Sequence, residues 1–253
     1  MSGLDISILI GSLVMVGAGL SIVQRFIPHH RREPHNDVAG FIFAAVAVMY
    51  AVPLAFVVIA VWGNADAARQ TTFQEADALA GIYWISRDMP LPLGAQLEHE
   101  TLDYANTVIG TEWPLMGTTH ASSPAATQLV YAMRNSVFSF NPTTAQQQVL
   151  LDHAVTHVED LATERRARLN QLTDEVPPLM WVVLIAGAVL TIGFTFLFGL
   201  SNTLAHVVMV LTLTGLVVVS LLVIKEMSYP FSGSTKIDPT AFEVFLSRLP
   251  TPR

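Results

Sequence analysis

Four apolar stretches, each long enough to cross a lipid bilayer, flank a polar segment of 112 residues. About 20 helical residues, rising 1.5 Å each, match a hydrocarbon core that is ~30 Å thick. The stretches cover residues 6–26, 38–62, 179–200 and 204–224, and none contains Asp or Glu. The pattern predicts an all-α polytopic membrane protein, with four transmembrane helices in two hairpins and a helical extramembrane lobe between spans 2 and 3.

The polar segment is predicted to form a series of helices separated by prolines, because it lacks the alternation of apolar and polar residues that indicates strands. The predicted lobe helices cover residues 70–88, 93–111, 123–138 and 143–175. The last helix carries an interrupted apolar stripe, formed by Leu150, Val155, Val158, Leu161, Leu169 and Leu172, and its start at Thr143 or Thr144 is typical of a capped helix. These limits divide the chain into a first transmembrane hairpin (1–62), a helical lobe (63–177), a second hairpin (178–225) and a C-terminal tail (226–253).

The polar run His29–Asp37 predicts a tight loop between the first two spans, and two of its residues are arginines. The other short loop, residues 201–203, carries no charge. Because arginines of short loops favour the cytoplasmic side, we expect this first loop inside and the lobe and both termini outside the cytoplasmic membrane. Arg165, Arg166 and Arg168 lie close to the third span and argue for the opposite orientation.

The composition narrows the classes of function. Hydrophobic residues make up 52% and charged residues 13% of the chain, whereas soluble domains have about 25% charged residues. The chain has no cysteine, which excludes disulfides and thiolate metal sites. Most of the net charge of −7 comes from residues 65–176, where 14 acids face 6 arginines, so a nucleic-acid partner is not expected. The N-terminal stretch lacks the basic residues and cleavage site of a signal peptide, and we expect a retained span.

Candidate chemical sites are weak. His153 and His157 are four residues apart and share a helix face with Asp160. No Glu lies between them in the metalloprotease arrangement, and no third His or Cys is nearby. We therefore interpret these residues as a solvated helix face and predict no metal site. His206, near the start of the fourth span, is expected at the membrane interface. The chain contains no G-x-S-x-G, P-loop or H-E-x-x-H motif, so we predict no catalytic residues, no cofactor and no enzyme. The lack of acids within the predicted spans also argues against a proton-coupled transporter.

A dense charged cluster formed by Glu164, Arg165, Arg166 and Arg168 precedes the third span. These arginines could bind lipid phosphates, attract anions at a pore mouth, or pair with acids of the same lobe. The acids available for pairing include Glu75, Asp77 and Glu112. Because a helical lobe with many acids offers many partners, pairing within the lobe is the favoured interpretation, and anion attraction is the main alternative.

Aromatic and turn residues supply the remaining candidates. The sequence Tyr229–Gly233 predicts a turn at the bilayer surface after the last span, with its phenylalanine packed against a bundle or a partner. Glu112–Pro114 is expected to end a lobe helix, with Tyr104 two turns earlier on a similar face. Trp62 and Trp181 are expected at one membrane interface, as in an aromatic belt.

Taken in order, these residues resemble the bacterial bestrophin-like membrane proteins, a family of four-span proteins with a helical lobe between spans 2 and 3. The resemblance covers most of the chain. It is carried by Glu75, Ala76, Leu79, Tyr104, Glu112, Trp113, Pro114, Arg165, Arg166, Arg168, Leu169, Pro178, Trp181, Pro230, Phe231, Gly233, Pro239 and Phe242. The family commonly has an acid and an arginine just before the last Pro-Phe pair, where this chain has Ser228 and Tyr229, so a charge role is not carried over to that point.

The resemblance implies remote kinship with bestrophin anion channels, which are oligomers with a central pore. The leading hypothesis is therefore a homo-oligomeric channel for small ions, with anions favoured, embedded among membrane lipids. The alternative is a non-conducting accessory or scaffold subunit that binds a larger membrane complex. A ring-shaped homo-oligomer would favour the first, and a monomer or hetero-complex the second.

Overall fold

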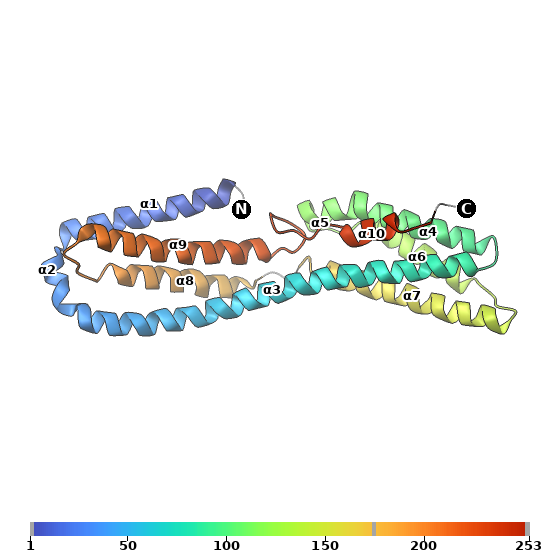
Figure 1. Ribbon diagram of the computed structural model, residues 1–253, viewed down its shortest axis with the longest axis horizontal. Coiled ribbons are helices and arrows are strands. Elements are labelled where there is room, and N and C mark those ends of the chain that lie inside the picture. The colour runs from blue at the N-terminus through green and yellow to red at the C-terminus, as the bar shows by residue number, and fades with distance from the viewer. Residues whose placement is uncertain (1–2, 174–175, 251–253) are drawn as a thin grey trace. The chain divides into compact units, whose positions relative to one another are not determined.

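The computed structural model describes residues 3–173 and 176–250, and every regular element in these ranges is helical (Figure 1). The elements are α1 (Gly3–Phe26), α2 (His29–Arg32), η1 (Glu33–His35), α3 (Asn36–Asp88), α4 (Leu93–Thr107), η2 (Val108–Glu112), α5 (Trp113–Thr119), α6 (Pro124–Phe138), α7 (Ala145–Asn170), α8 (Pro178–Thr195), α9 (Thr203–Met227) and α10 (Thr240–Ser247). Of the two short η elements, η1 is a 3-10 helix and η2 is a π-helical turn. The predicted all-α fold is confirmed for these residues.

The chain divides into two compact units. The membrane unit comprises Met1–Gly63 and Glu175–Ser228, and the lobe unit comprises Asn64–Asp174 and Tyr229–Arg253. Helix α3 contributes its first part to the membrane unit and its second part to the lobe unit. The segment that follows α9 belongs to the lobe unit.

Within the described residues, four helical stretches are long and apolar enough to cross a membrane, as predicted: Gly3–Phe26, His29–Asp88, Pro178–Thr195 and Thr203–Met227. In the membrane unit α9 packs against α1 and α8, and Figure 1 shows α1 and α9 side by side. Two small apolar clusters fill the interior of this unit. One contains Val57, Val61, Leu184 and Ile224, and the other contains Tyr50, Ala188 and Val217.

The two short loops of the membrane unit contact each other. The first loop, predicted as a tight loop, folds into the short helices α2 and η1. Arg32 donates from Nη1 to the carbonyl of Phe196 (2.7 Å), and Asn36 exchanges two hydrogen bonds with the backbone of Gly199 (2.7 and 2.9 Å). A Cβ atom on Gly199 would lie 2.5 Å from the carbonyl oxygen of His29, so only glycine fits there. These contacts explain why α8 ends at Thr195, five residues before the predicted end of the span.

Helix α3 includes both the second predicted span and the first predicted lobe helix, which the sequence predicted as separate helical ranges. The connecting residues 63–69 include three alanines, which favour helix, and no proline. Pro53 also lies inside this helix. Helix propensity through the connection therefore prevails over the change from apolar to polar sequence.

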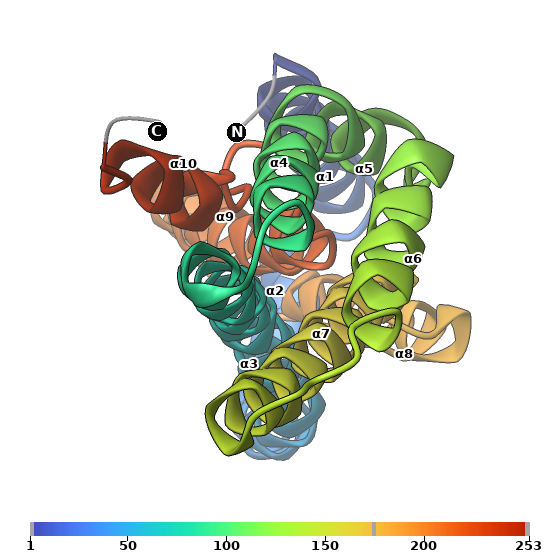
Figure 2. The ribbon, with the colours of Figure 1, turned by 90° about the vertical axis from the view of Figure 1, so that its right-hand side faces the viewer.

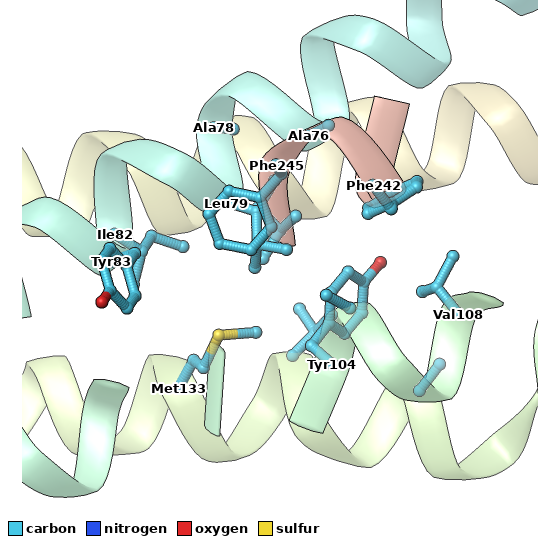
Figure 3. Packing of buried hydrophobic residues seen from close by; sticks show 14 of the residues in the cluster. Ala76, Ala78, Leu79, Ile82, Tyr83, Tyr104, Val108, Met133, Phe242 and Phe245 are labelled. Carbon is cyan, nitrogen blue, oxygen red and sulfur yellow. The ribbon is translucent and has the colours of Figure 1, made fainter. Parts of the chain in front are cut away.

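The lobe unit has one apolar core, to which α3, α4, α6, α7 and α10 contribute (Figure 3). Figure 2 views these helices nearly end-on, with α6 beside α7 and α10 beside α4. Leu79 of α3 and Met133 of α6 are fully buried in this core. Phe242 and Phe245 of α10 are buried in it as well, so the C-terminal segment completes the lobe core.

The limits of the lobe helices differ from prediction most clearly at Pro114. The chain stays helical through η2 into α5, because Pro114 lies in the first turn of α5, where no backbone N–H is needed. The expected helix end at Glu112–Pro114 is therefore wrong, and α5 ends before His120, whose φ is 52°. Thr144 caps α7 by accepting a hydrogen bond from the Gln147 N–H (3.2 Å), as predicted. Helix α7 ends at Asn170, and residues 174–175 of the predicted helix lie outside the described residues.

Candidate functional site

Two arginines lie on the buried face of α7. The buried residues of this helix are Ala154, Val158, Leu161, Arg165 and Arg168, spaced by three or four positions. Arg165 is 6% exposed and Arg168 is fully buried. The stripe predicted from the apolar residues is therefore not interrupted, because the two arginines occupy its missing positions.

The acids that face these arginines come from two other elements of the lobe. Glu75 lies on α3, on the same face as Leu79 and Ile82, four and seven residues further on. Glu112 is the last residue of η2. Both carboxylates are fully buried.

Arg168 contacts both carboxylates at once. Its Nε and Nη2 atoms donate to the two oxygens of Glu75, at 2.5 and 2.9 Å. Nη2 also donates to Oε1 of Glu112 at 2.7 Å, and Nη1 lies 2.7 Å from the sulfur of Met116. The fork of one guanidinium therefore links α7 to α3 and to η2 through charge-assisted hydrogen bonds.

The second carboxylate oxygen of Glu112 is also fully used. Arg165 donates to Oε2 from Nη2 at 2.6 Å, and the backbone N–H of Ser123 donates to the same oxygen at 2.8 Å. Ser123 also caps α6, because its hydroxyl accepts a hydrogen bond from the Ala126 N–H. Glu112 therefore ties η2 to α7 and to the start of α6.

Aromatic side chains enclose these charges. The Tyr104 hydroxyl donates to Oε1 of Glu75 at 2.5 Å. The guanidinium carbon of Arg168 lies 5.1 Å from the ring centre of Trp113, within the range of a cation–π contact. Trp113 in turn meets the edges of Phe231 and Phe242, with ring centres 5.5 and 6.0 Å away. We call Glu75, Tyr104, Glu112, Arg165 and Arg168 the buried charged cluster.

The charged groups of this cluster shift one another's pKa values. Burial alone would raise the pKa of Glu112, but the charges of Arg168 and Arg165 outweigh burial and hold this pKa below its usual value. Burial would lower the pKa of Arg168, and the charge and hydrogen bonds of Glu75 raise it above its ordinary value. Burial, followed by the Glu75 charge, holds the pKa of Tyr104 well above its usual value. At neutral pH these shifts keep Glu112 an anion, Arg168 a cation and Tyr104 a neutral phenol.

The structure brings together most of the residues singled out in the sequence. The predicted pairing of the α7 arginines with lobe acids is confirmed for Arg165 and Arg168. Arg166 is exposed, and its guanidinium donates to the Thr163 hydroxyl (3.2 Å). Trp181 lies in the membrane unit, where it packs beside the Leu184 cluster, and is not part of the charged cluster.

The turn predicted after the last span is present in the lobe unit. Pro230 and Phe231 are buried, and Gly233 has a φ of 80°, a conformation that favours glycine. The carbonyl of Pro230 accepts a hydrogen bond from the N–H of Ile237 (2.8 Å), which closes a loop. The carbonyl of Ile237 accepts a hydrogen bond from Trp113 Nε1 (2.9 Å). The C-terminal segment thereby reaches the edge of the charged cluster.

The histidines predicted to lie on a solvated face differ from each other. His153 is exposed, but the ring of His157 lies against Gly81, where an added Cβ would be 2.6 Å from it. Among the described residues, no group of three or more His, Cys, Asp or Glu side chains could hold a metal ion. The contact between the His157 ring and Gly81 is a packing contact between α7 and α3.

Several buried polar contacts were not expected from the sequence. His206 is 3% exposed, and its ring lies within hydrogen-bond distance of the carbonyl of Thr195 (3.1 Å) and the amide of Gln24 (3.3 Å). Asp5 is fully buried and pairs with Lys225 at 2.8 Å. The sequence offered one signal for the pair of Asp5 and Lys225, since an acid lies in the first turn of α1 and a base in the last turn of α9.

The fold and the cluster define a four-span helical membrane protein with an ion-paired lobe. The profile of the bestrophin-like domain matches residues 10–242, and the chain belongs to this family. A crystal structure of a bacterial bestrophin homolog from Klebsiella pneumoniae is similar, with a TM-score of 0.68, 13% identity, and coverage of 93% of this chain and 95% of that one. A mutant of such a homolog gives a TM-score of 0.69 at 13% identity, covering 94% and 98%.

A further crystal structure, described as a membrane protein, has a TM-score of 0.71 and 13% identity, covering 95% of this chain and 98% of that one. At these identities the likeness shows a shared fold. A search of curated proteins gave no match.

Proposed function

We propose that the chain forms a homo-oligomeric channel of the cytoplasmic membrane that passes small ions, with anions favoured. The observation that carries this proposal is the family match over residues 10–242, which includes all four candidate spans in whole or in part. The family takes its name from the bestrophin anion channels. The bacterial homologs that share the fold support the same class of function.

The packing of the membrane unit favours a pore between copies over a pore through one copy. Leu184 and Ile224 are fully buried in the interior, and Val217 is 6% exposed. Thr195 and Thr214 are also buried, and their hydroxyls donate to carbonyls of their own helices. A conduit formed by the outer surfaces of several copies would be mostly apolar, and such a constriction gates by dewetting.

We further propose that the four spans form two hairpins, with the lobe and both termini outside the cytoplasm. The arginines of the first loop support this orientation. Arg165 and Arg168, which argued against it, are paired with buried carboxylates and present no free charge to the lipid surface. Because the chain has no native cysteine, single cysteines at exposed positions such as His30 and His153 can be labelled selectively in intact cells to test it. Labelling of His30→Cys but not His153→Cys by an impermeant reagent would overturn the orientation.

Arg166 is the member of the arginine cluster that is free to attract anions at a pore mouth. Its side chain is exposed and its hydrogen bond is to the neutral Thr163, so its charge is not cancelled by a buried acid. We therefore assign the pore-mouth role to Arg166.

Ion flux through purified protein in liposomes tests this function. Under imposed gradients of chloride and potassium, we expect flux above protein-free vesicles, with a preference for chloride. Arg166→Gln should lower chloride flux and leave the thermal unfolding midpoint nearly unchanged, whereas Arg134→Gln, an exposed arginine of α6, is the matched control and should leave flux unchanged. Correctly inserted protein that is silent to both ions would overturn the channel and favour an accessory subunit.

A further inference from the structure

The lobe unit contains a pocket that the proposed channel does not use. It has a volume of about 380 Å³ and lies between η2, α5 and the C-terminal loop, where Ile109, Trp113, Pro114, Phe231 and Pro239 form an apolar wall. Ligand pockets of small molecules begin at about 300 Å³ and are mostly apolar with a few polar groups. The size and lining of this pocket are those of a site for a small molecule.

The wall of the pocket is held rigidly before any ligand binds. Trp113 is fixed by its hydrogen bond to the carbonyl of Ile237 and by the guanidinium of Arg168. Phe231 meets the Trp113 ring edge-on, with an interplanar angle of 89°. A Cβ on Gly117 would lie 3.1 Å from the carbonyl oxygen of Phe231, so glycine at this position lets α5 lie close to the C-terminal loop. A preformed wall lowers the ordering cost of binding.

The polar side of the pocket carries one charge of each sign. Lys236 and Asp238 both line it, with Nζ and Oδ1 3.5 Å apart and side chains 56% and 60% exposed. Thr118 and Ser232 belong to the same lining. The hydrogen bond from the Ile237 N–H to Pro230 closes the loop that carries Lys236. An exposed pair of this kind is worth little to folding, so its two charges are available to a ligand.

We propose that this pocket binds a small zwitterion with an apolar part, in which an acidic group lies beside Lys236 and an ammonium group beside Asp238. An α-amino acid carries both charges on one carbon, so both can reach the adjacent pair while an apolar side chain contacts Trp113 and Phe231. A single-charged ligand would leave one partner of the pair unused. The same two charged groups occur in a free apolar amino acid and in the headgroup of an aminophospholipid, whose acyl chains supply the apolar part.

Calorimetric titration of the full-length protein in detergent with L-leucine and with glycerophosphoethanolamine tests the proposal. We expect saturable binding of at least one of them. Saturable binding of leucine identifies a soluble amino acid as the source, and binding of glycerophosphoethanolamine alone identifies the lipid headgroup. Analogues of the bound probe that lack either the ammonium or the acidic group should bind about tenfold more weakly, as expected for the loss of one charged contact.

Variants distinguish this site from non-specific binding. Lys236→Gln and Asp238→Asn should each weaken binding about tenfold, and Thr118→Trp should fill the pocket and abolish binding. Asp152→Asn, an exposed acid of α7, is the matched control and should bind like the native protein. The absence of saturable binding for both probes, or unchanged affinity in both charge variants, would overturn the proposal. The assay needs no ion flux, so an empty pocket and a silent channel are separate results.

Discussion

The membrane unit and the lobe unit distribute polar and apolar side chains in different ways. The membrane unit exposes large apolar side chains, among them Phe41 (81% exposed), Met49 and Leu204, and buries Asp5 and His206. The lobe unit buries its apolar side chains in one core and also buries two arginines with two glutamates. Exposed apolar surface of this extent is expected where lipid replaces water as the solvent.

This difference shows which contacts select one packing arrangement of the helices in each unit. In the membrane unit, where helices and lipid are equally apolar, polar contacts such as Asp5 with Lys225 and Arg32 with Phe196 select the packing of the helices. In the lobe, the removal of apolar side chains from water already drives the helices together, and the charged cluster selects one packing arrangement among many that bury the same apolar surface. The two units therefore respond differently to the loss of a single polar group.

The largest expected effect follows from removing the cation that both carboxylates share. Arg168→Met leaves Glu75 and Glu112 buried without this partner and should lower the free energy of unfolding by about 3–5 kcal/mol. Thermal and urea unfolding of the purified protein measure the change. Arg166→Met is the matched control, and at this exposed position the change should stay within about 0.5 kcal/mol. Equal stability of the two variants would show that the cluster does not determine lobe stability.

A smaller loss is expected from Tyr104→Phe, which removes the hydrogen bond to Glu75 and keeps the ring. Hydrogen bonds to charged groups contribute about 1.5–3 kcal/mol, and this range sets the expected loss.

The same variant should change the pH dependence of stability. Because the folded lobe raises the pKa of Tyr104, the native protein should lose stability as pH rises above about 10, and the variant should lack this part of the loss. The pKa of Glu112 is lowered in the fold, so its contribution is complete above about pH 4.3 and disappears as pH falls further, in both proteins. Urea unfolding across pH measures both limbs. An identical alkaline limb in the variant would contradict the assignment to Tyr104.

The smallest effect is expected at a backbone contact of the membrane unit. Gly199→Ala places a Cβ against the backbone of His29 and Glu33 and should cost about 1–3 kcal/mol, because the two short loops must separate. Gly193→Ala is the control, since a Cβ at this exposed position of α8 meets nothing within 4 Å. Thermal unfolding in detergent compares the two, and a Gly199 variant as stable as the Gly193 variant would show that the loop contact is dispensable.

The sequence predicts the four spans well because each is a continuous apolar run whose signal needs no tertiary contact. The ends of helices depend on other parts of the chain and were less accurate. The early end of α8 depends on Gly199 fitting against the first loop, more than 160 residues away. The continuity of α3 follows from the helix-favouring alanines of residues 63–69. The change there from apolar to polar sequence made the helix hard to follow by hydropathy alone.

The charged cluster could be predicted in part. The spacing of Arg165 and Arg168 completes the stripe of Val158 and Leu161, so a search for any residue at helical spacing would have placed both arginines on the buried face. The choice of Glu75 and Glu112 over the other lobe acids could not be read from spacing, because it depends on how three helical segments meet. The link from Ser123 to Glu112 involves a backbone N–H, which no side-chain pattern reveals.

The double contact of Arg168 also fixes the axial alignment of the lobe helices. Sliding α7 by one turn, about 5.4 Å, would remove Arg168 from both carboxylates and Arg165 from Glu112 in a single step. Partial slippage gains nothing, since an intermediate position leaves all four charges without partners in an apolar interior. The cluster therefore holds α7 in one axial position relative to α3 and η2.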